Sequence, residues 1–358
     1  MKLGVQRLEA ALRAPFAAAH GTVCGRALLL VCLEAADGLR GYGEAAPLPS
    51  YDGVDVDLVR AALEQCRPVL DAYPDAVPVA DVMARCAEAT VVSEALAAID
   101  LALWDLAGRR VREPVWRLLG AAAPPVVAVN WTISAADRAG AAAEAAQARF
   151  DGFDTVKLKV GIGDDGARLA AVRAFSGPAM AIRLDANGAW SPDEARAVLE
   201  AVEPVGIELC EEPVHGVDAI RALRADVEVP LALDESAAEP DALDAPAAAD
   251  AVCLKLGRCG GISGLVDAAG RARAAGYQVY LASTLDGPLG IAGALQAAAA
   301  IAPDRACGLA TLALFADRPV PIAPIRGTLA PTPGAGLGDG LLAWYGAGPG
   351  RPPSSLAI

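Results

Sequence analysis

A series of short apolar runs that end in charged residues is the feature that most constrains the fold. The first run carries two lysines, and the later ones end in Asp, Glu, Asp and Lys at intervals of 26, 23 and 21 residues. Each interval is the length of one strand, one helix and two loops, so the series predicts successive βα units of a parallel barrel. Catalytic groups in such barrels lie at the carboxyl ends of the strands, where these side chains should converge. The charged residues of the series are Lys157, Lys159, Asp185, Glu211, Asp234 and Lys255.

The length and composition of the chain limit how many domains it can form and which classes of protein it can belong to. Its 358 residues are too many for one small core and suggest two domains, or a large barrel with an addition. The net charge of −14 argues against a nucleic-acid surface, which needs clustered Lys and Arg. There is no apolar run of about 18 residues that would suggest a membrane span, and the N-terminus lacks the pattern of a secretory signal. We therefore expect a soluble, cytoplasmic protein that binds neither nucleic acid nor membrane.

The eight cysteines are scattered, with no Cys-x-x-Cys pair and no paired histidines. Zinc and redox motifs are therefore absent from the sequence. Cys210 and Cys253 fall inside apolar strand-like runs, and we interpret them as reduced core thiols.

The remaining segments predict how the barrel is completed. Residues 1–120 combine strand-like runs with helical segments at 56–70 and 92–108, which is typical of an α+β domain. Residues 121–318 alternate strand and helix, and the Pro/Gly-rich residues 319–358 are expected to return to the first domain. The predicted fold class is α/β: a TIM-type (β/α) barrel with an N-terminal α+β capping domain completed by the C-terminal tail. The eight predicted barrel strands are 126–133, 155–160, 182–186, 207–211, 231–234, 252–256, 279–283 and 307–311.

Three carboxylates from adjacent strands, with no histidine on the predicted strands that carry them, form an oxygen-only site. Such a site suits Mg²⁺, or Mn²⁺, rather than Zn²⁺. Lysines from the strands on either side would face each other across the ion. A lysine near a divalent cation, in a site closed from water, can act as a base. This chemistry is suited to removing a proton next to a carboxylate while the metal stabilises the resulting enediolate.

Five motifs, in order and at barrel spacing, resemble the enolase superfamily and in particular its muconate-lactonizing subgroup. The resemblance covers nearly the whole chain and implies a Mg²⁺-dependent enzyme with a lysine base. The motifs are Lys157-Leu-Lys159, Asp185-Ala-Asn187-Gly188, Glu211-Glu-Pro213, Asp234-Glu-Ser236 and Lys255-Leu-Gly257, with Gly43-Glu44-Ala45 in the cap.

The resemblance also implies a role for each motif residue. It makes Asp185, Glu211 and Asp234 the metal ligands, and Lys159 and Lys255 the acid/base pair on opposite faces of the substrate. Lys157 lies two residues before Lys159 on the same strand and should point to the same side, where it would tune Lys159 or touch the substrate carboxylate. Asn187 and Glu235 would orient the ligands. Glu212 should point to the opposite side from Glu211, with a structural or a ligand-orienting role.

Residues outside these motifs are candidates for contacting the substrate. His20 and Tyr51 lie in segments that resemble the two cap loops that close over substrate in this family. Ser283 ends the seventh predicted strand and Asp286 follows it, at a position that resembles the one where the lactonizing enzymes usually carry Glu. Related subgroups place a histidine base on that strand, but here it reads Gln-Val-Tyr-Leu-Ala-Ser-Thr from residue 278, so a histidine base is not expected.

The sequence is compatible with several of the reactions that the subgroup catalyses. The segments 43–49 and 306–311 resemble the branch that dehydrates a cyclohexadiene carboxylate to o-succinylbenzoate, which we favour. The alternatives are a dipeptide epimerase, an N-acylamino acid racemase and a muconate cycloisomerase. By the same resemblance, a dipeptide epimerase would carry an Asp-x-Asp pair on the eighth strand, and this pair is not evident in residues 306–311. A barrel that binds a small carboxylate without catalysis is the alternative from another class, and homo-oligomers are common among barrel enzymes with such a cap.

Overall fold

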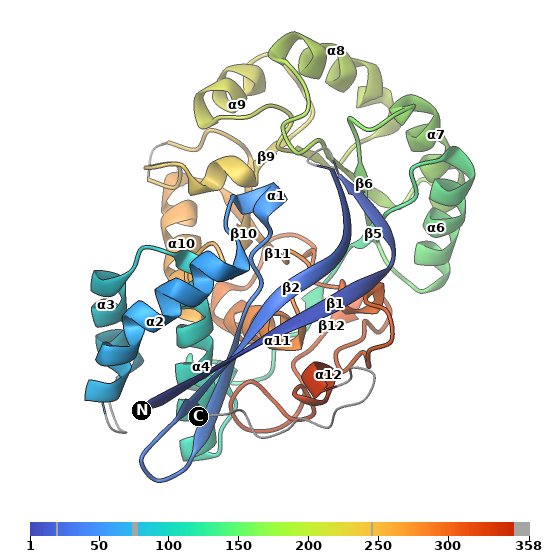
Figure 1. The fold of residues 1–358 in the computed structure, drawn as a ribbon. Helices are drawn as coiled ribbons and strands as arrows, with labels where there is room; N and C mark the ends of the chain where they lie inside the picture. The colour runs from blue at the N-terminus through green and yellow to red at the C-terminus, as the bar shows by residue number, and fades with distance from the viewer. Residues whose placement is uncertain (19–20, 74–77, 245, 347–358) are drawn as a thin grey trace.

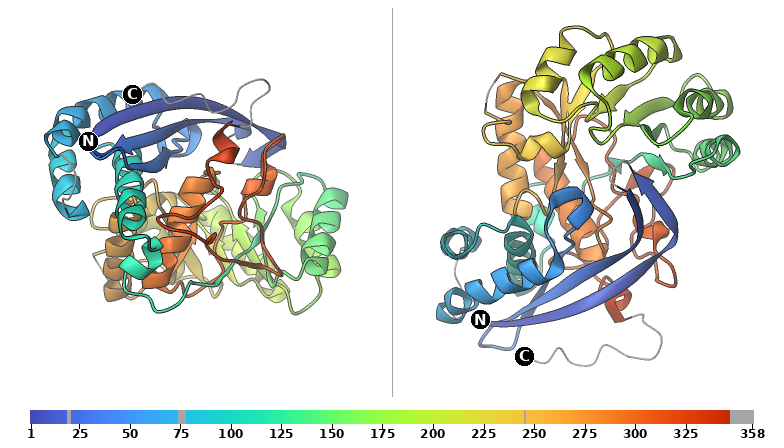
Figure 2. Two further views of the ribbon diagram at one scale, coloured as in Figure 1. Left: turned by 90° about the horizontal axis from the view of Figure 1, so that it is seen from below. Right: turned by 45° about the horizontal axis from the view of Figure 1, so that its top comes forward.

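A computed structural model describes residues 1–18, 21–73, 78–244 and 246–346, and it contains a cap and a barrel (Figure 1). The cap begins with a three-stranded antiparallel sheet in the order β1-β2-β3. Figure 2 shows its two long strands arching over one end of the barrel. The cap elements are β1 (Lys2–Ala18), β2 (Gly21–Glu34), β3 (Arg40–Ala45), α1 (Pro49–Asp52), α2 (Val56–Ala72), α3 (Val79–Ala89), α4 (Ser93–Val111) and α5 (Val115–Leu118).

Helix α4 packs directly on strand β3, and two glycines allow the close approach. A Cβ atom at Gly43 would lie 2.0 Å from the carbonyl oxygen of Ala98, and one at Gly41 would lie 2.1 Å from that of Ala102. Any larger residue at either position would push the helix away from the strand. The predicted helices at 56–70 and 92–108 are confirmed as α2 and α4.

Seven parallel strands form the barrel sheet, in the order β5-β6-β7-β8-β9-β10-β11. They are β5 (Trp131–Ile133), β6 (Thr155–Lys159), β7 (Ala181–Asp185), β8 (Leu209–Glu211), β9 (Leu231–Leu233), β10 (Ala251–Lys255) and β11 (Gln278–Ala282). The helices around them are α6 (Arg138–Phe150), α7 (Asp165–Ser176), α8 (Pro192–Val202), α9 (Val217–Arg224), α10 (Ile262–Ala275) and α11 (Pro288–Ile301), with a 3₁₀ turn η1 (Glu203–Val205) after α8. The predicted α/β fold with a capped parallel barrel is confirmed.

The ring is completed by a short segment where an eighth strand was predicted. Cys307 bridges to Val129 and Gly308 bridges to Ala282, so the segment joins the two edges of the sheet. The prediction of a regular strand over 307–311 is wrong, because Thr311 already has helical backbone angles and leads into the 3₁₀ turn η3 (Leu312–Leu314). The first predicted strand is also divided: β4 (Val127–Ala128) pairs with β12 (Thr328–Leu329), and only β5 joins the barrel.

The fifth βα unit has no helix in its described part. Strand β9 is followed by a 3₁₀ turn, η2 (Glu235–Ala238), and then by turns that lead to β10. The spacing of 21 residues between Asp234 and Lys255 predicted a helix here, and that prediction is wrong. Pro240 and Pro246 explain the difference, since each removes a backbone donor and blocks a helical turn before it.

The C-terminal segment predicted to return to the cap, 319–358, does so over its described part, and residues 347–358 lie outside the described residues. The Leu337 amide donates to Asp105 Oδ1 on α4 (2.9 Å), and the Val115 amide donates to the Gly336 carbonyl (3.0 Å). The short helix α12 (Ala343–Gly346) follows, and its Trp344 ring packs edge-on against Phe315 with 5.2 Å between ring centroids. Within the described residues no helix is long and apolar enough to cross a membrane.

Glu44 joins the cap, the barrel and this C-terminal segment. Its carboxyl group is buried on β3 and accepts a hydrogen bond from the Gly287 amide (2.7 Å) at the start of α11. The Tyr345 hydroxyl donates to its other oxygen and accepts from the Leu289 amide (2.9 Å). Burial, together with the nearby charge of Asp286, raises the pKa of Glu44 to about 8.

The raised pKa of Glu44 makes the stability of the fold depend on pH. The group ionises near pH 4.5 in an unfolded chain and near pH 8 in the fold, so its contribution is fully present below 4.5 and is lost as the pH rises to 8. We expect the free energy of unfolding of wild type to fall more steeply between about pH 5 and pH 8 than that of Glu44→Gln. Denaturant unfolding at a series of pH values measures both slopes.

The control for this experiment is Glu88→Gln, whose side chain is 66% exposed. This variant should keep the wild-type slope. Equal slopes for wild type and Glu44→Gln would contradict a buried, protonated Glu44.

Candidate functional site

The carboxyl ends of the barrel strands bring the predicted charged residues together. In the strand register Lys159 lies beside Asp185, and Asp185 lies beside Glu211. Asp234 follows directly after β9, and Lys255 ends β10. Side chains alternate along a strand, so Lys157 points inward with Lys159. All six residues are at least nine-tenths buried.

Two lysines share the carboxylate of Asp185. Lys157 Nζ lies 2.8 Å from Asp185 Oδ2 and donates to Glu211 Oε1 (2.7 Å), while Lys159 Nζ donates to Asp185 Oδ2 (2.5 Å) and to Asn187 Oδ1 (2.7 Å). Burial opposes the charge of Lys157, but Asp185 and Glu211 outweigh it and raise the pKa of Lys157. Burial likewise opposes the charge of Asp185, and the two lysines lower its pKa below the usual range.

A segment of the cap reaches the barrel through Tyr51. The Tyr51 hydroxyl donates to Asp234 Oδ1 (2.8 Å), and Lys255 Nζ donates to Asp234 Oδ2 (2.6 Å). Lys255 Nζ also lies over the Tyr51 ring, 3.8 Å from its centroid, in a cation–π contact. Although burial opposes its charge, Asp234 raises the pKa of Lys255.

Glu211 lies at the centre of the array. The Tyr280 hydroxyl on β11 donates to Glu211 Oε2 (2.9 Å), and the Arg183 guanidinium stacks over the Tyr280 ring at 4.8 Å. Burial raises the pKa of Glu211 to about 7, and the charges of Asp185 and Asp234 act in the same direction. Because ionising the buried Glu211 carboxyl group is costly, a cation bound next to it would stabilise its charged form.

The donor set fits a divalent cation. Ligand atoms of Glu211, Asp234 and Cys253 lie within 4.8 Å of one another and are buried. Asp185 adds a third carboxylate from the neighbouring strand, where its Oδ2 is held by the two lysines. Several carboxylate oxygens and no histidine are the ligand chemistry that Mg²⁺ prefers.

A second row of residues holds these side chains in place. Glu212 is fully buried and accepts hydrogen bonds from the Asp234 amide (2.8 Å) and the Ser236 amide (3.1 Å), and also from the Ser236 hydroxyl. Its carboxylate thereby fixes the turn that carries Asp234, and burial raises its pKa to about 8. Asn187 Nδ2 donates to Glu235 Oε1 (2.9 Å), so the predicted pair lies together beside Lys159.

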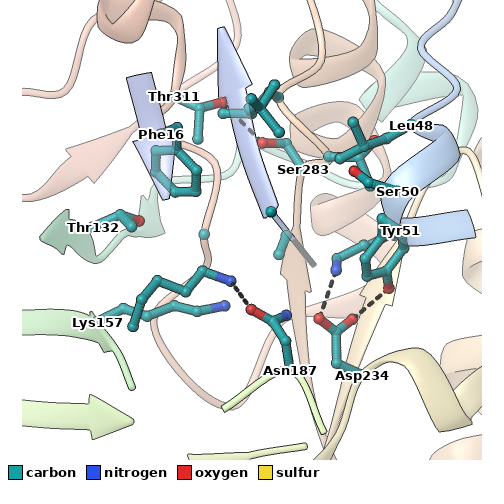
Figure 3. Close-up of a pocket in the computed structure, with 18 residues that line it drawn as sticks. Phe16, Leu48, Ser50, Tyr51, Thr132, Lys157, Asn187, Asp234, Ser283 and Thr311 are labelled. Carbon is teal, nitrogen blue, oxygen red and sulfur yellow. Dashed lines mark hydrogen bonds and ion pairs between the residues drawn. The ribbon is translucent and has the colours of Figure 1, made fainter. Parts of the chain in front are cut away.

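A cavity between the cap and the barrel opens onto this array (Figure 3). Lys157, Lys159 and Lys255 line one part of it. The opposite part is formed by Phe16 and by the hydroxyl groups of Ser283 and Thr311, which lie 2.9 Å apart. Other lining residues include Leu48, Ser50, Tyr51, Thr132, Asn187 and Asp234. Among the described residues that line the cavity, Asp234 is the only acid, and it is paired with Lys255.

The structure separates one of the predicted substrate-contacting residues, Asp286, from this cavity. Asp286 is buried and accepts hydrogen bonds from the Thr284 hydroxyl (2.8 Å) and amide (3.3 Å). It lines a neighbouring cleft with Glu44 and Glu94 between the cap and the barrel. His20 lies outside the described residues. Tyr51 and Ser283 both line the cavity, as described above.

Comparison with known proteins agrees with this geometry. Residues 140–341 match the family described as enolase C-terminal domain-like, and residues 2–120 match the mandelate racemase/muconate lactonizing enzyme N-terminal domain. The chain belongs to the mandelate racemase/muconate lactonizing enzyme family of the enolase superfamily. The resemblance found in the sequence is thereby confirmed.

Proteins with different activities are similar to this chain over much of its length. The o-succinylbenzoate synthase of Mycobacterium tuberculosis is 41% identical over 222 residues, which are 58% of this chain and 66%, just under two thirds, of that enzyme. The L-Ala-D/L-Glu epimerase of Bacillus subtilis is 30% identical over 310 residues, which are 84% of each chain. The dipeptide epimerase of Cytophaga hutchinsonii, in a crystal structure with Mg and D-Ala-L-Val, has a TM-score of 0.85 at 25% identity and covers 95% of each chain.

Two residues of this superfamily site were missed in the sequence. Tyr280 was not singled out, and Cys253, which is a buried core thiol as predicted, was not expected beside the carboxylates. Both face the carboxylates from neighbouring strands. Strand alternation contained the signal, because Cys253 lies two residues before Lys255 and must share its face. A second signal is composition: the chain has only four lysines, and three of them are in this site.

We expect Glu212→Gln to weaken Mg²⁺ binding by roughly 10- to 100-fold, the usual cost of disturbing a residue that orients a metal ligand. An amide cannot accept all the hydrogen bonds that Glu212 accepts from the turn carrying Asp234. Isothermal titration calorimetry with Mg²⁺ measures the effect. Glu200→Gln, on the exposed face of α8, is the control and should leave the affinity unchanged. Wild-type affinity in Glu212→Gln would show that this turn needs no anchor.

Proposed function

We propose that this enolase-superfamily chain removes a proton α to a carboxylate and forms an enediolate, with Mg²⁺ as its cofactor. One observation carries the proposal. Lys159 and Lys255 reach the same cavity from β6 and β10, and the carboxylates of Asp185, Glu211 and Asp234, from the three strands between them, form ion pairs with Lys157, Lys159 and Lys255. Mg²⁺ bound by Asp185, Glu211 and Asp234 would hold the substrate carboxylate and stabilise the charge of the enediolate.

Lys159 is the candidate base. Its Nζ lines the cavity and is oriented by Asp185 Oδ2 and Asn187 Oδ1. An amine must lose its proton before it can accept one from the substrate, and lysine, unlike arginine, can do so in a closed site. Lys157 stays charged, since Asp185 and Glu211 raise its pKa, and we assign it to the substrate carboxylate and to the charge balance around Lys159.

Lys255 takes the opposite face of the substrate. Asp234 and the Tyr51 ring both hold its Nζ as an ammonium ion. A fixed positive charge stabilises an enediolate without transferring a proton. In a dehydration that uses one base, Lys159 would remove the α-proton and then assist the departing water.

The favoured substrate is the cyclohexadiene carboxylate that loses water to give o-succinylbenzoate. The part of the cavity away from the lysines presents Phe16 and the hydroxyls of Ser283 and Thr311. The single lining acid among the described residues, Asp234, is engaged by Lys255, so no carboxylate there is free to pair with an α-ammonium group. The identity with the mycobacterial o-succinylbenzoate synthase supports the same choice.

Racemisation of an N-succinylamino acid is the second candidate. Its support is the placement of two lysines on different strands facing one cavity, which is what inversion by two bases requires. The N-succinyl-L-Arg/Lys racemase of Bacillus cereus is 30% identical over 286 residues, 77% of each chain. Such a substrate also lacks a free α-ammonium group.

We expect Lys159→Ala and Lys159→Arg to slow exchange of the substrate α-proton by about 10²- to 10⁴-fold, the usual contribution of a general base. Arginine keeps the positive charge but cannot be deprotonated, so it separates proton transfer from charge. Deuterium incorporation in D₂O, followed by NMR with Mg²⁺ present, is the measurement. Lys2→Arg, at an exposed position of β1, is the control. Exchange near the wild-type rate in both Lys159 variants would contradict the assignment.

A substrate panel distinguishes the candidate reactions. We expect the cyclohexadiene carboxylate to be converted with a kcat/KM about 10²-fold or more above that of any dipeptide, because the α-ammonium group would be buried without a partner. Lys255→Ala should retain measurable dehydration, and should abolish inversion of N-succinylamino acids if two bases are needed. Efficient epimerisation of dipeptides would reject the favoured reaction. Mg²⁺ binding without proton exchange on any member of the panel would favour a non-catalytic barrel.

A further inference from the structure

Cys253 contributes a sulfur atom to the cluster of carboxylates. Its Sγ and one oxygen each of Glu211 and Asp234 lie within 4.8 Å of one another, and all three side chains are buried. Cys253 pairs with Tyr280 in the strand register and shares the inner face of β10 with Lys255. The barrel thus holds a thiol within reach of two of the three proposed Mg²⁺ ligands.

The neighbouring Cys210 shows that this placement is particular to Cys253. Cys210 lies between Leu209 and Glu211 on β8, so strand alternation turns its side chain to the opposite side from Glu211. Its Sγ contacts the Glu211 carbonyl at 4.0 Å, and it does not belong to the described cluster. Both thiols are buried to a similar degree, at 0% and 2% exposure, so position and not burial distinguishes them.

We propose that Cys253 makes this site selective between classes of metal ion: with Glu211 and Asp234 it binds thiophilic divalent ions such as Zn²⁺, Co²⁺ and Cd²⁺ through sulfur. The proposal rests on the metal site of the proposed function. Mg²⁺ takes oxygen ligands and leaves the thiol uncoordinated, whereas Zn²⁺ accepts thiolate and carboxylate together, with a Zn–S distance of about 2.3 Å. The coordinating thiol releases its proton to the buffer.

The position of Cys253 predicts what such an ion does to the site. Cys253 is two residues, about 6–7 Å along the strand, before Lys255 at the mouth of the barrel. An ion held by Cys253, Glu211 and Asp234 would leave Asp185 paired with Lys157 and Lys159. Since Lys159 would keep its ion pair with Asp185, Zn²⁺ is expected to occupy the site without supporting proton abstraction.

Co²⁺ provides a direct test on the full-length protein. Titration of the wild-type protein with Co²⁺, without added thiols, should produce an intense thiolate-to-cobalt charge-transfer band in the near ultraviolet that saturates at one ion per chain. Cys253→Ala and Cys253→Ser should lose the band, and Cys210→Ala should keep it. Equilibrium dialysis should show Zn²⁺ affinity reduced by about tenfold or more in Cys253→Ala, since even outer partners of metal ligands cost that much. Mg²⁺ affinity should stay unchanged.

The outcomes separate this proposal from the proposed function. A charge-transfer band that persists in both Cys253 variants, or bound Co²⁺ without a band in the wild type, would overturn the role of Cys253. Mg²⁺ affinity retained in the variants shows that they are folded, and its loss together with the Co²⁺ band would assign Cys253 a packing role and overturn selectivity. Proton exchange with Mg²⁺ but no band leaves the proposed function intact, whereas a band without proton exchange on any substrate rejects that function and retains the thiol ligand.

Discussion

The structure depends on a buried array of opposite charges at the mouth of the barrel. Each of three lysines lies within hydrogen-bonding distance of one or two of three carboxylates, and all six residues are at least nine-tenths buried. Desolvating so many charges is expensive, and an apolar core of the same shape would cost less. The array therefore holds charged groups in fixed positions for binding and catalysis, and it does not serve mainly to stabilise the fold. Its net charge is close to zero, so a divalent cation added among the carboxylates shifts the balance towards neutral lysine.

The cap is part of this array and does more than cover it. Tyr51, from the short helix α1, donates a hydrogen bond to Asp234 and supports Lys255 with its ring. The position of α1 depends in turn on β3, which Gly41 and Gly43 allow to lie against α4. Glu44 then ties β3 to the start of α11 and to Tyr345. The cap consequently supplies part of the site through Tyr51.

Much of the site could be predicted because period and spacing are strong signals. The intervals between Asp185, Glu211 and Asp234 predicted the βα units of the barrel. Strand alternation predicted that Lys157 points to the same side as Lys159. Two features could not be predicted from spacing alone. The segment after β9 has no helix in its described part, because prolines interrupt it, and the ring is closed at Cys307 and Gly308 by single bridges instead of a regular strand. The direction of the Asp286 side chain was also hidden, because it depends on how the cap packs on the barrel. Cys253 is a buried free thiol of the core, as its apolar run predicted, but the run did not show that it also lies beside Glu211 and Asp234.

The distribution of lysine offers the most direct test of the central claim, that a divalent cation among the carboxylates controls the charge of the lysines. The chain has four lysines, at positions 2, 157, 159 and 255, so selective labelling yields a spectrum of four side chains. NMR of the labelled Cε and Nζ atoms during a Mg²⁺ titration would follow each of them. The account predicts that the three lysines of the site shift saturably, with at least one becoming a neutral amine at a lower pH, while exposed Lys2 stays unchanged. Four signals indifferent to Mg²⁺ would contradict it.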